Sequence, residues 1–143
     1  MKIFTIGFTK TTAENFFSRL SSAGVKKIID ARLKNGSQLS GFAKAKDLKF
    51  FSKQLCNASY VHDLNLAPTQ EILDAYKKKE ITWGQYEERF NNLMKIREIE
   101  KFEPKEFENA CLLCSEDKPH FCHRRLVVEY LKEKWGNVEI IHL

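Results

Sequence analysis

Short apolar runs alternate with amphipathic segments along almost the whole chain, and this alternation constrains the fold more than any other feature. The runs have the length and composition of buried strands, and the segments between them carry apolar residues at helical spacing. Parallel neighbouring strands need helical crossovers, so this order predicts a mostly parallel sheet covered on both faces. We therefore expect a single three-layer α/β domain over residues 1–143 with about five strands. The predicted strands are residues 2–7, 25–32, 60–64, 110–116 and 138–143.

Capping signals mark where the predicted helices begin and end. Thr11 and Glu14 have the spacing of a capping box, and Gly24 is a typical stop just past the helix that follows. Residues 33–42, rich in Gly, Ser and Asn, are predicted to be a loop before a second helix. A later helix begins near Cys122 and places its apolar residues on one side.

Residues 66–104 are predicted to form a helical insertion before the fourth strand. Pro68 interrupts the strand pattern, and Thr82 with Gln85 repeats the capping-box spacing ahead of a long helix. Trp83, Tyr86 and Phe90 share a face of this helix, which also carries basic residues. Such a stripe is typical of core packing, and the alternative is a surface on which nucleic-acid bases stack.

Composition bounds the class of protein. The 43% hydrophobic content supports a folded core and excludes a disordered tail or a collagen-like fibre. A net charge of +5 permits a phosphate-bearing partner. No segment has the roughly 18–20 apolar residues of a membrane helix, and the chain does not begin with a signal-peptide pattern. We expect a cytoplasmic protein with reduced thiols and no membrane association, whose oligomeric state the sequence leaves open.

Polar side chains gather where the predicted strands end. Ligands of open parallel sheets bind outside the carboxyl ends of the strands, where the loops converge and the following helices point their positive N-termini. The residues delivered to this edge are Gly7 and Thr9 from the first strand, Asp30 and Arg32 from the second, His62 from the third, and Cys114 and Glu116 from the fourth.

The densest chemical signal is the segment 114–125, CSEDKPHFCHRR. If a helix begins near Cys122, unpaired backbone amides and the neighbouring Arg124 favour the thiolate of that cysteine, which makes it a candidate nucleophile. His123 is a candidate acid or base, and Arg124 a candidate ligand for a phosphate or carboxylate.

Packing is the alternative for each of these groups. Cysteine is often buried, so Cys111 and Cys114 inside an apolar strand are also expected as core residues. Asp30 and Arg32 can form an ion pair with each other, and His62 can be a partly buried imidazole whose hydrogen bonds are satisfied.

Zinc is a rival use of the same side chains. Cys114, Cys122 and His123 can supply three ligands, with a fourth from His62, His120 or His142. The spacing disfavours zinc, because seven residues part the two thiols and neighbouring side chains on a helix are expected to diverge. The sequence therefore predicts no resident cofactor, with zinc as the exception to test.

Four motifs together resemble a known family. Thr5–Gly7 reads TIG, Asp30–Arg32 reads DAR, Tyr60–His62 reads YVH, and the segment from Leu112 to Leu131 contains the Cys-His-Arg signature. In this order they resemble the family that shares a domain of unknown function numbered 488 (DUF488). The resemblance implies a compact α/β domain in which the motifs meet, without an established reaction. The implied site residues are Gly7, Thr9, Asp30, Arg32, Tyr60, His62, Cys114, Glu116, Cys122, His123 and Arg124.

The chain departs from the family pattern at three places. Phe8 and Thr9 stand where the family usually has His-Ser, so one imidazole of the first strand is missing. The segments 33–42 and 63–68 replace a Pro-containing stretch and a Leu-Pro-x-Leu-Gly stretch. These differences indicate a divergent member.

Two classes of function fit these observations. The first is an enzyme for a phosphorylated, nucleotide or nucleic-acid substrate, with Cys122, His123, Asp30 and His62 in catalysis and Arg32 and Arg124 on an anion. Gly7, Thr9, Tyr60, Cys114 and Glu116 then complete substrate binding. The second is a non-catalytic module that binds nucleic acid through its positive charge and the aromatic stripe. A zinc-stabilised structural domain is a third alternative.

Overall fold

The computed structural model describes residues 1–36 and 41–143, and there the predicted alternation of strands and helices is present. Residues 37–40, within the predicted loop 33–42, lie outside the described residues. None of the described helices has the length and apolar character needed to span a membrane. In chain order the elements are β1 (Lys2–Gly7), α1 (Ala13–Ala23), β2 (Lys27–Asp30), α2 (Ala45–Cys56), β3 (Ser59–His62), α3 (Gln70–Lys77), α4 (Trp83–Arg97), β4 (Ala110–Cys114), α5 (His123–Trp135) and β5 (Glu139–His142).

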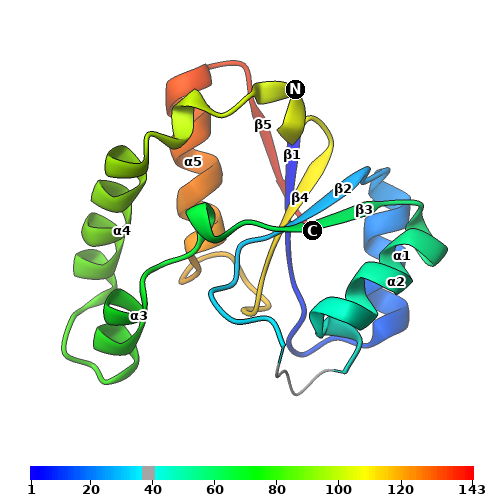
Figure 1. The fold of residues 1–143 in the computed structure, drawn as a ribbon, viewed down its shortest axis with the longest axis horizontal. Helices are drawn as coiled ribbons and strands as arrows, with labels where there is room; N and C mark the ends of the chain where they lie inside the picture. Colours follow the sequence, from blue (N-terminus) through cyan, green and yellow to red (C-terminus); the bar gives the residue numbers. More distant parts are fainter. Residues whose placement is uncertain (37–40) are drawn as a thin grey trace.

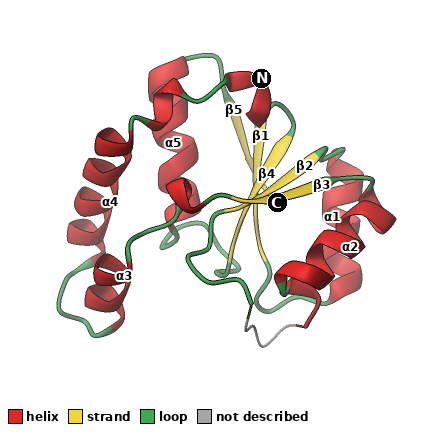
Figure 2. Ribbon diagram, in the orientation of Figure 1, coloured by secondary structure: helices red, strands yellow, loops and turns green. Residues whose placement is uncertain are grey.

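The strands form one parallel sheet in the order β3-β2-β4-β1-β5, as Figure 2 shows. Gly7 of β1 pairs with Cys114 of β4, and Asp30 of β2 pairs with both Leu113 of β4 and His62 of β3. The carboxyl ends of these four neighbouring strands are therefore level at one edge of the sheet. The predicted α/β class and parallel sheet are confirmed.

Helices cover both faces of the sheet (Figure 1). The helices α1 and α2 lie on one face, and α3, α4 and α5 lie on the other. Alternate residues of a strand point to opposite faces, so β4 contributes to two cores. Cys111 and Leu113 pack on the α1–α2 side, and Leu112 packs on the other side. The predicted core position of Cys111 is confirmed, since its side chain is fully buried.

The capping signals are correct for α4 and one residue off for α1. Thr82 and Gln85 form the predicted reciprocal capping box. The cap of α1 is Thr12 rather than Thr11, and its hydroxyl accepts the Asn15 backbone N–H. Only Thr11 has a glutamate three residues later, but the backbone path into the helix makes Thr12 the cap, without a capping box. Gly24 ends α1 in the left-handed conformation, as expected.

Four strands, β2 to β5, are shorter than predicted, and for three of them neighbouring turns use the backbone groups. The N–H of Val25 donates to Leu20 at the end of α1, so β2 begins later. The side chain of Asp63 accepts the Asn65 N–H and starts a short 3-10 helix, so β3 ends at His62. The strand β4 ends at Cys114, and the next carbonyl, of Ser115, accepts hydrogen bonds from Thr9.

The predicted insertion is the pair α3 and α4, which lies between β3 and β4 in the chain. The helix α4 packs on α5 in the outer layer (Figure 1). Tyr86 and Phe90 of the aromatic stripe are buried, together with Met94. The core interpretation of the stripe is thus correct for these two rings, and Trp83 is only partly buried.

The end of β1 is crossed at close range by the loop that follows β4. A Cβ atom at Gly7 would lie 1.6 Å from the carbonyl oxygen of Glu116 and 3.2 Å from Nη1 of Arg124. A side chain cannot occupy this space while the loop keeps its path. Gly7 is therefore required for the approach of the loop to the sheet.

We predict that Gly7→Ala lowers the free energy of unfolding by about 1–3 kcal/mol, because the backbone around Glu116 must shift. Gly84→Ala is the matched control. Gly84 lies in the first turn of α4 with only a 3.8 Å contact to its new methyl group, and removing a helical glycine raises stability by about 0.5 kcal/mol. Urea unfolding of both variants measures the difference. Equal stability of the two variants would contradict the steric role of Gly7.

Candidate active-site pocket

A pocket of about 500 Å³ lies at the carboxyl edge of the sheet. The strand β4 sits between β1 and β2, whose connections lead to α1 and α2 on one face, whereas the chain after β4 leads to α5 on the other. Chains that diverge to opposite faces leave a crevice between them. The lining residues are Arg32, Leu33, Lys34, Pro68, Gln70, Leu73, Tyr76, Lys77, Trp83, Tyr86, Cys114, Ser115, Glu116, Phe121, Cys122 and His123.

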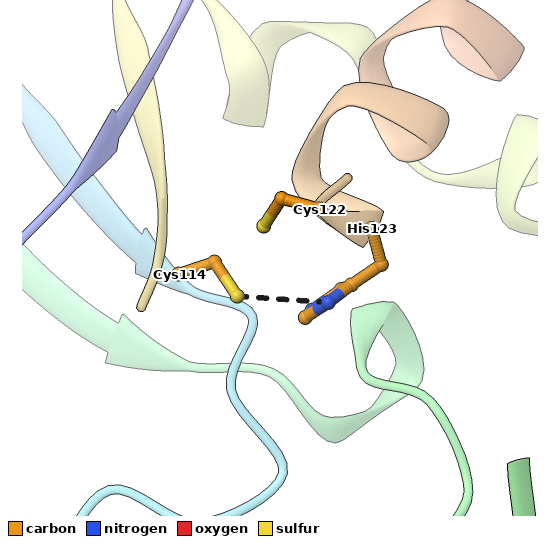
Figure 3. A group of neighbouring side chains, drawn as sticks. All are labelled: Cys114, Cys122 and His123. Atoms are coloured by element: carbon orange, nitrogen blue, oxygen red, sulfur yellow. Dashed lines mark hydrogen bonds between the residues drawn. The ribbon is translucent and has the colours of Figure 1, made fainter. Parts of the chain in front are cut away.

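Two thiols and one imidazole meet at this pocket (Figure 3), and we call Cys114, Cys122 and His123 the thiol–imidazole cluster. Their sulfur and nitrogen atoms all lie within 4.8 Å of one another. All three residues are buried, with 7%, 3% and 6% of their surface exposed. Cys114 ends β4, and the other two residues begin α5, so the cluster joins the two elements that flank the crevice.

The expected divergence of Cys122 and His123 is wrong. Cys122 is the N-cap of α5 and has extended backbone angles, φ −137° and ψ 136°, whereas His123 is the first helical residue. The geometry of two adjacent helical side chains therefore does not apply to this pair. Because the backbone changes conformation between them, both side chains turn toward Cys114 (Figure 3).

Hydrogen bonds orient the ring of His123. Its Nε2 lies 2.7 Å from the carbonyl oxygen of Ala31, which can only accept, so Nε2 carries the hydrogen. The other nitrogen, Nδ1, faces Sγ of Cys114 at 3.6 Å. The ring of Phe90 packs against the imidazole with 5.5 Å between centroids. The imidazole thus directs the lone pair of Nδ1 toward the sulfur of Cys114.

The two thiols of the cluster have opposite electrostatic environments. A hydrogen bond from Cys122 is the main cause that lowers the pKa of Cys114, and the Ser115 backbone and Arg124 act in the same direction. Burial, followed by the interaction with Cys114, raises the pKa of Cys122 well above its ordinary value. This result is opposite to the predicted thiolate at Cys122. The helix terminus is too deeply buried for its amides to compensate the lost hydration.

Asp30 and Arg32 form the buried ion pair that the sequence analysis gave as an alternative. Nε and Nη2 of Arg32 donate to the two carboxylate oxygens at 2.8 and 2.7 Å, and the Tyr60 hydroxyl donates to the same carboxylate at 2.5 Å. Nη2 also donates to the Ala43 carbonyl oxygen. Nη1 is buried and has no hydrogen-bond partner among the described residues. Arg32 lines the pocket, whereas Asp30 and Tyr60 hold it from behind.

His62 and Phe8 also support Arg32 rather than line the pocket. His62 Nε2 donates to the Arg32 carbonyl oxygen at 2.6 Å, which is the satisfied imidazole considered from the sequence. The guanidinium carbon of Arg32 lies 5.2 Å from the ring centroid of Phe8. A phenyl ring in the position of the usual family histidine therefore packs on the buried cation.

Arg124 is fully buried and does not line the pocket. Its Nη1 and Nη2 donate to the carbonyl oxygens of Glu116 and Asp117, and its Nε donates to the Thr5 hydroxyl. Thr9 acts nearby, donating through its hydroxyl and its N–H to the Ser115 carbonyl oxygen. The predicted anion-binding role of Arg124 is not supported, because the guanidinium is occupied by the loop after β4.

Of the site residues named from the sequence, five line the pocket: Arg32, Cys114, Glu116, Cys122 and His123. The other six lie behind it: Gly7, Thr9, Asp30, Tyr60, His62 and Arg124. Gly7 leaves room for the loop after β4, and the polar side chains of the others position the strand ends and loops on which the first five lie. The sequence motifs therefore mark both the pocket and its support, and spacing alone does not separate the two.

Four aromatic rings form a wall of the pocket that the sequence did not predict. Trp83 stacks on Tyr86 with centroids 4.8 Å apart, and it meets Tyr76 and Phe121 edge-on at 5.5 and 5.6 Å. All four rings line the pocket, and Phe121 is 62% exposed. Helical spacing correctly predicted that the stripe packs inward. It did not predict that the end of the insertion would reach the strand edge, because that depends on where α3 and α4 dock.

A second hollow, of about 590 Å³, lies between α1 and α2. Its lining includes Phe17, Phe42, Phe51 and Leu55, with Glu14 as the charged member, and contains no thiol or imidazole. Reactive groups are therefore concentrated in the pocket at the strand edge, which we take as the candidate site.

We predict that Tyr60→Phe lowers the free energy of unfolding by about 1.5–3 kcal/mol, because the buried Asp30 carboxylate loses a hydrogen bond. Burial, followed by the bond to Asp30, raises the pKa of Tyr60 from 10.0 to about 12. The native chain thus keeps a proton that the unfolded chain releases, so the contribution of Tyr60 is complete below pH 10 and is lost toward pH 12. In urea unfolding across this range, the difference in the free energy of unfolding between wild type and Tyr60→Phe should become smaller as the pH rises. A difference that stays constant with pH, or an equal difference for Tyr76→Phe, would contradict this role.

Comparison with known proteins agrees with the motifs. The model of the family described as domain of unknown function DUF488 matches residues 12–131, from the cap of α1 into α5. No curated protein and no solved structure matches the chain. The matched region contains β2, β3, β4 and the whole thiol–imidazole cluster, and it covers most of the sequence. The chain belongs to the DUF488 family.

Proposed function

We propose that this protein is an enzyme that binds a small phosphorylated molecule with a flat ring, of the nucleotide kind, and acts on it at the thiol–imidazole cluster. One observation carries the proposal: a single pocket combines an aromatic wall, an excess of cationic side chains and a buried group of reactive atoms. Ligand pockets of enzymes have this combination of apolar walls and a few convergent polar groups.

The aromatic wall supports a flat ligand. A volume of about 500 Å³ is in the range of small-molecule sites, and four rings stand on one side of it. Aromatic rings stack on nucleobases with little dependence on the base, because every base has a π-face. Phe121 and the partly buried Trp83 are the rings with surface to offer such a contact.

The charges of the lining support an anion. Arg32, Lys34 and Lys77 line the pocket against one carboxylate, that of Glu116. Arg32 also has at Nη1 hydrogens that no described residue accepts. Since Arg124 is occupied by the loop, the anion-binding role passes to Nη1 of Arg32 and to the exposed Lys77.

The buried cluster supports an enzyme over a pure binding module. Two thiols and an imidazole that converge on the wall of a pocket are not needed to hold a nucleotide. Their atoms are chemically competent, since His123 has one nitrogen fixed by Ala31 and the other directed at Cys114. We therefore place the reacting part of the substrate against Cys114 and His123.

The nucleic-acid alternative has less support. Tyr86 and Phe90 are buried, so most of the aromatic stripe is not a stacking surface. Arg97, at the end of α4, donates through Nη1 to three backbone carbonyls, those of Leu64, Asn65 and Ala67. These contacts occupy one of the three cations of α4, whose others are Arg89 and Lys95, so fewer of them are left for a phosphate backbone.

Fluorescence of Trp83 tests the binding step. In Trp135→Phe, which retains an aromatic ring against Phe107, Trp83 is the sole tryptophan and reports on the pocket. We expect saturable quenching by nucleoside mono- or polyphosphates and at least about tenfold weaker binding of the corresponding nucleosides. Lys77→Ala should weaken binding several-fold, and Lys78→Ala, an exposed neighbour outside the lining, should not. No response to any nucleoside phosphate at millimolar concentration would refute the proposal, and tighter, steeply salt-dependent binding of oligonucleotides would favour the alternative.

Turnover of the bound nucleotides tests the catalytic step. With product formation followed by chromatography, Cys114→Ser and His123→Gln should each lower kcat by about 100-fold or more while affinity changes little. Cys56→Ser, a half-buried thiol outside the pocket, should retain full activity. Unchanged turnover in both cluster variants would exclude these residues from the reaction.

A further inference from the structure

We propose that the thiol–imidazole cluster binds one Zn²⁺ ion through Sγ of Cys114, Sγ of Cys122 and Nδ1 of His123, with the fourth coordination position open to the pocket. The site itself stands on geometry, and its catalytic use rests on the proposed function. Two features of the sequence disfavoured zinc: the seven residues between the two thiols and the expected divergence of Cys122 and His123. The folded chain brings all three donor atoms together despite both.

The donor atoms have the separations of a tetrahedral site. Zinc bonds of about 2.3 Å to sulfur and about 2.0–2.1 Å to nitrogen, at tetrahedral angles, place sulfur about 3.6 Å from nitrogen and the two sulfurs about 3.8 Å apart. Sγ of Cys114 lies 3.6 Å from Nδ1 of His123, and the whole group fits within 4.8 Å. An ion therefore needs only small side-chain adjustments to bond to all three atoms.

The support around His123 is that of a metal ligand. A histidine that binds a metal usually donates its other N–H to a carbonyl or carboxylate, which fixes the ring and its tautomer. Nε2 of His123 donates to the Ala31 carbonyl oxygen at 2.7 Å and leaves Nδ1 as the free donor atom. Cys114 and Cys122 come from a strand end and a helix cap, which are firmly placed elements.

No fourth protein ligand belongs to the cluster among the described residues. His62 is engaged with the Arg32 carbonyl, and Nδ1 of His142 bonds to the Thr5 hydroxyl. His120 is exposed and does not line the pocket. Structural zinc sites are closed by four protein ligands, whereas catalytic sites keep one position for water or substrate. This donor set therefore favours a catalytic site over the zinc-stabilised structural domain considered from the sequence.

The open position faces the pocket because all three ligands line it. Thiolates are soft donors and imidazole suits transition metals, so this set favours zinc over magnesium or calcium, and two thiolates balance the charge of the ion. A buried ion with no net excess charge suits a cluster whose members are at most 7% exposed. With the ion bound, Cys114, Cys122 and His123 act as its ligands rather than as nucleophile or base. Within the proposed function, zinc then supplies the Lewis acid at the pocket in which Arg32 and the aromatic wall hold the substrate.

Metal content of the full chain, purified with a phosphine reductant, tests the site. We expect close to one equivalent of zinc in the wild type and in Cys56→Ser, and affinity lowered by more than about 100-fold in Cys114→Ser and Cys122→Ser. Co²⁺ should replace zinc and produce thiolate-to-cobalt charge-transfer and intense tetrahedral visible bands. Absence of both metals from wild type after incubation with excess ion, or equal binding by the cluster variants, would overturn the proposal.

Alkylation of the wild type provides a readout that does not depend on the variants folding. Zinc should protect Cys114 and Cys122 from iodoacetamide in partly destabilising urea, whereas Cys56 should react equally with and without the ion. Peptide mass spectrometry identifies each modified thiol, and a chelator should remove the protection. Equal modification in all conditions would contradict a zinc site. Zinc binding without nucleotide binding would contradict only the proposed function. Nucleotide binding without zinc binding would contradict only the zinc site.

Discussion

The guanidinium of Arg124 holds the candidate site together. It is fully buried and donates to Thr5 in β1 and to two carbonyl oxygens of the loop after β4. This loop carries the chain from Cys114 to the start of α5, so its path determines whether the two halves of the cluster meet. Gly7 leaves room for the loop, and Arg124 supplies the hydrogen bonds that its turned backbone lacks. A buried cation without these partners would cost several kcal/mol.

A second buried arginine organises the opposite side of the pocket. Arg32 is held by the Asp30 carboxylate, and its own carbonyl oxygen accepts the hydrogen of His62. The residue between this pair, Ala31, receives the Nε2 hydrogen of His123. The ion pair at the end of β2 therefore places the acceptor that orients the imidazole. Both arginine side chains donate hydrogen bonds to backbone carbonyl oxygens and so fix loop positions, and only Arg32 also lines the pocket.

Features that depend on neighbouring residues could be predicted from the sequence, whereas features that depend on tertiary packing could not. Strand order along the chain, the Thr82 capping box and the Gly24 stop depend on neighbouring residues and were correct. The predicted thiolate at Cys122 was wrong, because the sequence shows where the helix begins but not how deeply that end is buried, and burial raises the pKa of the thiol. The convergence of Cys122 and His123 was missed for a similar reason: the change of backbone conformation occurs between two adjacent residues.

The sequence by itself determined an α/β chain of the DUF488 family and the strand ends at which its polar residues collect. Periodicity and capping are local properties, so they can be read without coordinates. Only the tertiary structure decided which of these residues line the pocket and which instead hold its strand ends and loops in position. It also decided that Trp83 and Phe121, separated by 38 positions in the numbering, form one wall. Such contacts depend on how α4 and the loop before α5 dock against each other, which no local pattern encodes.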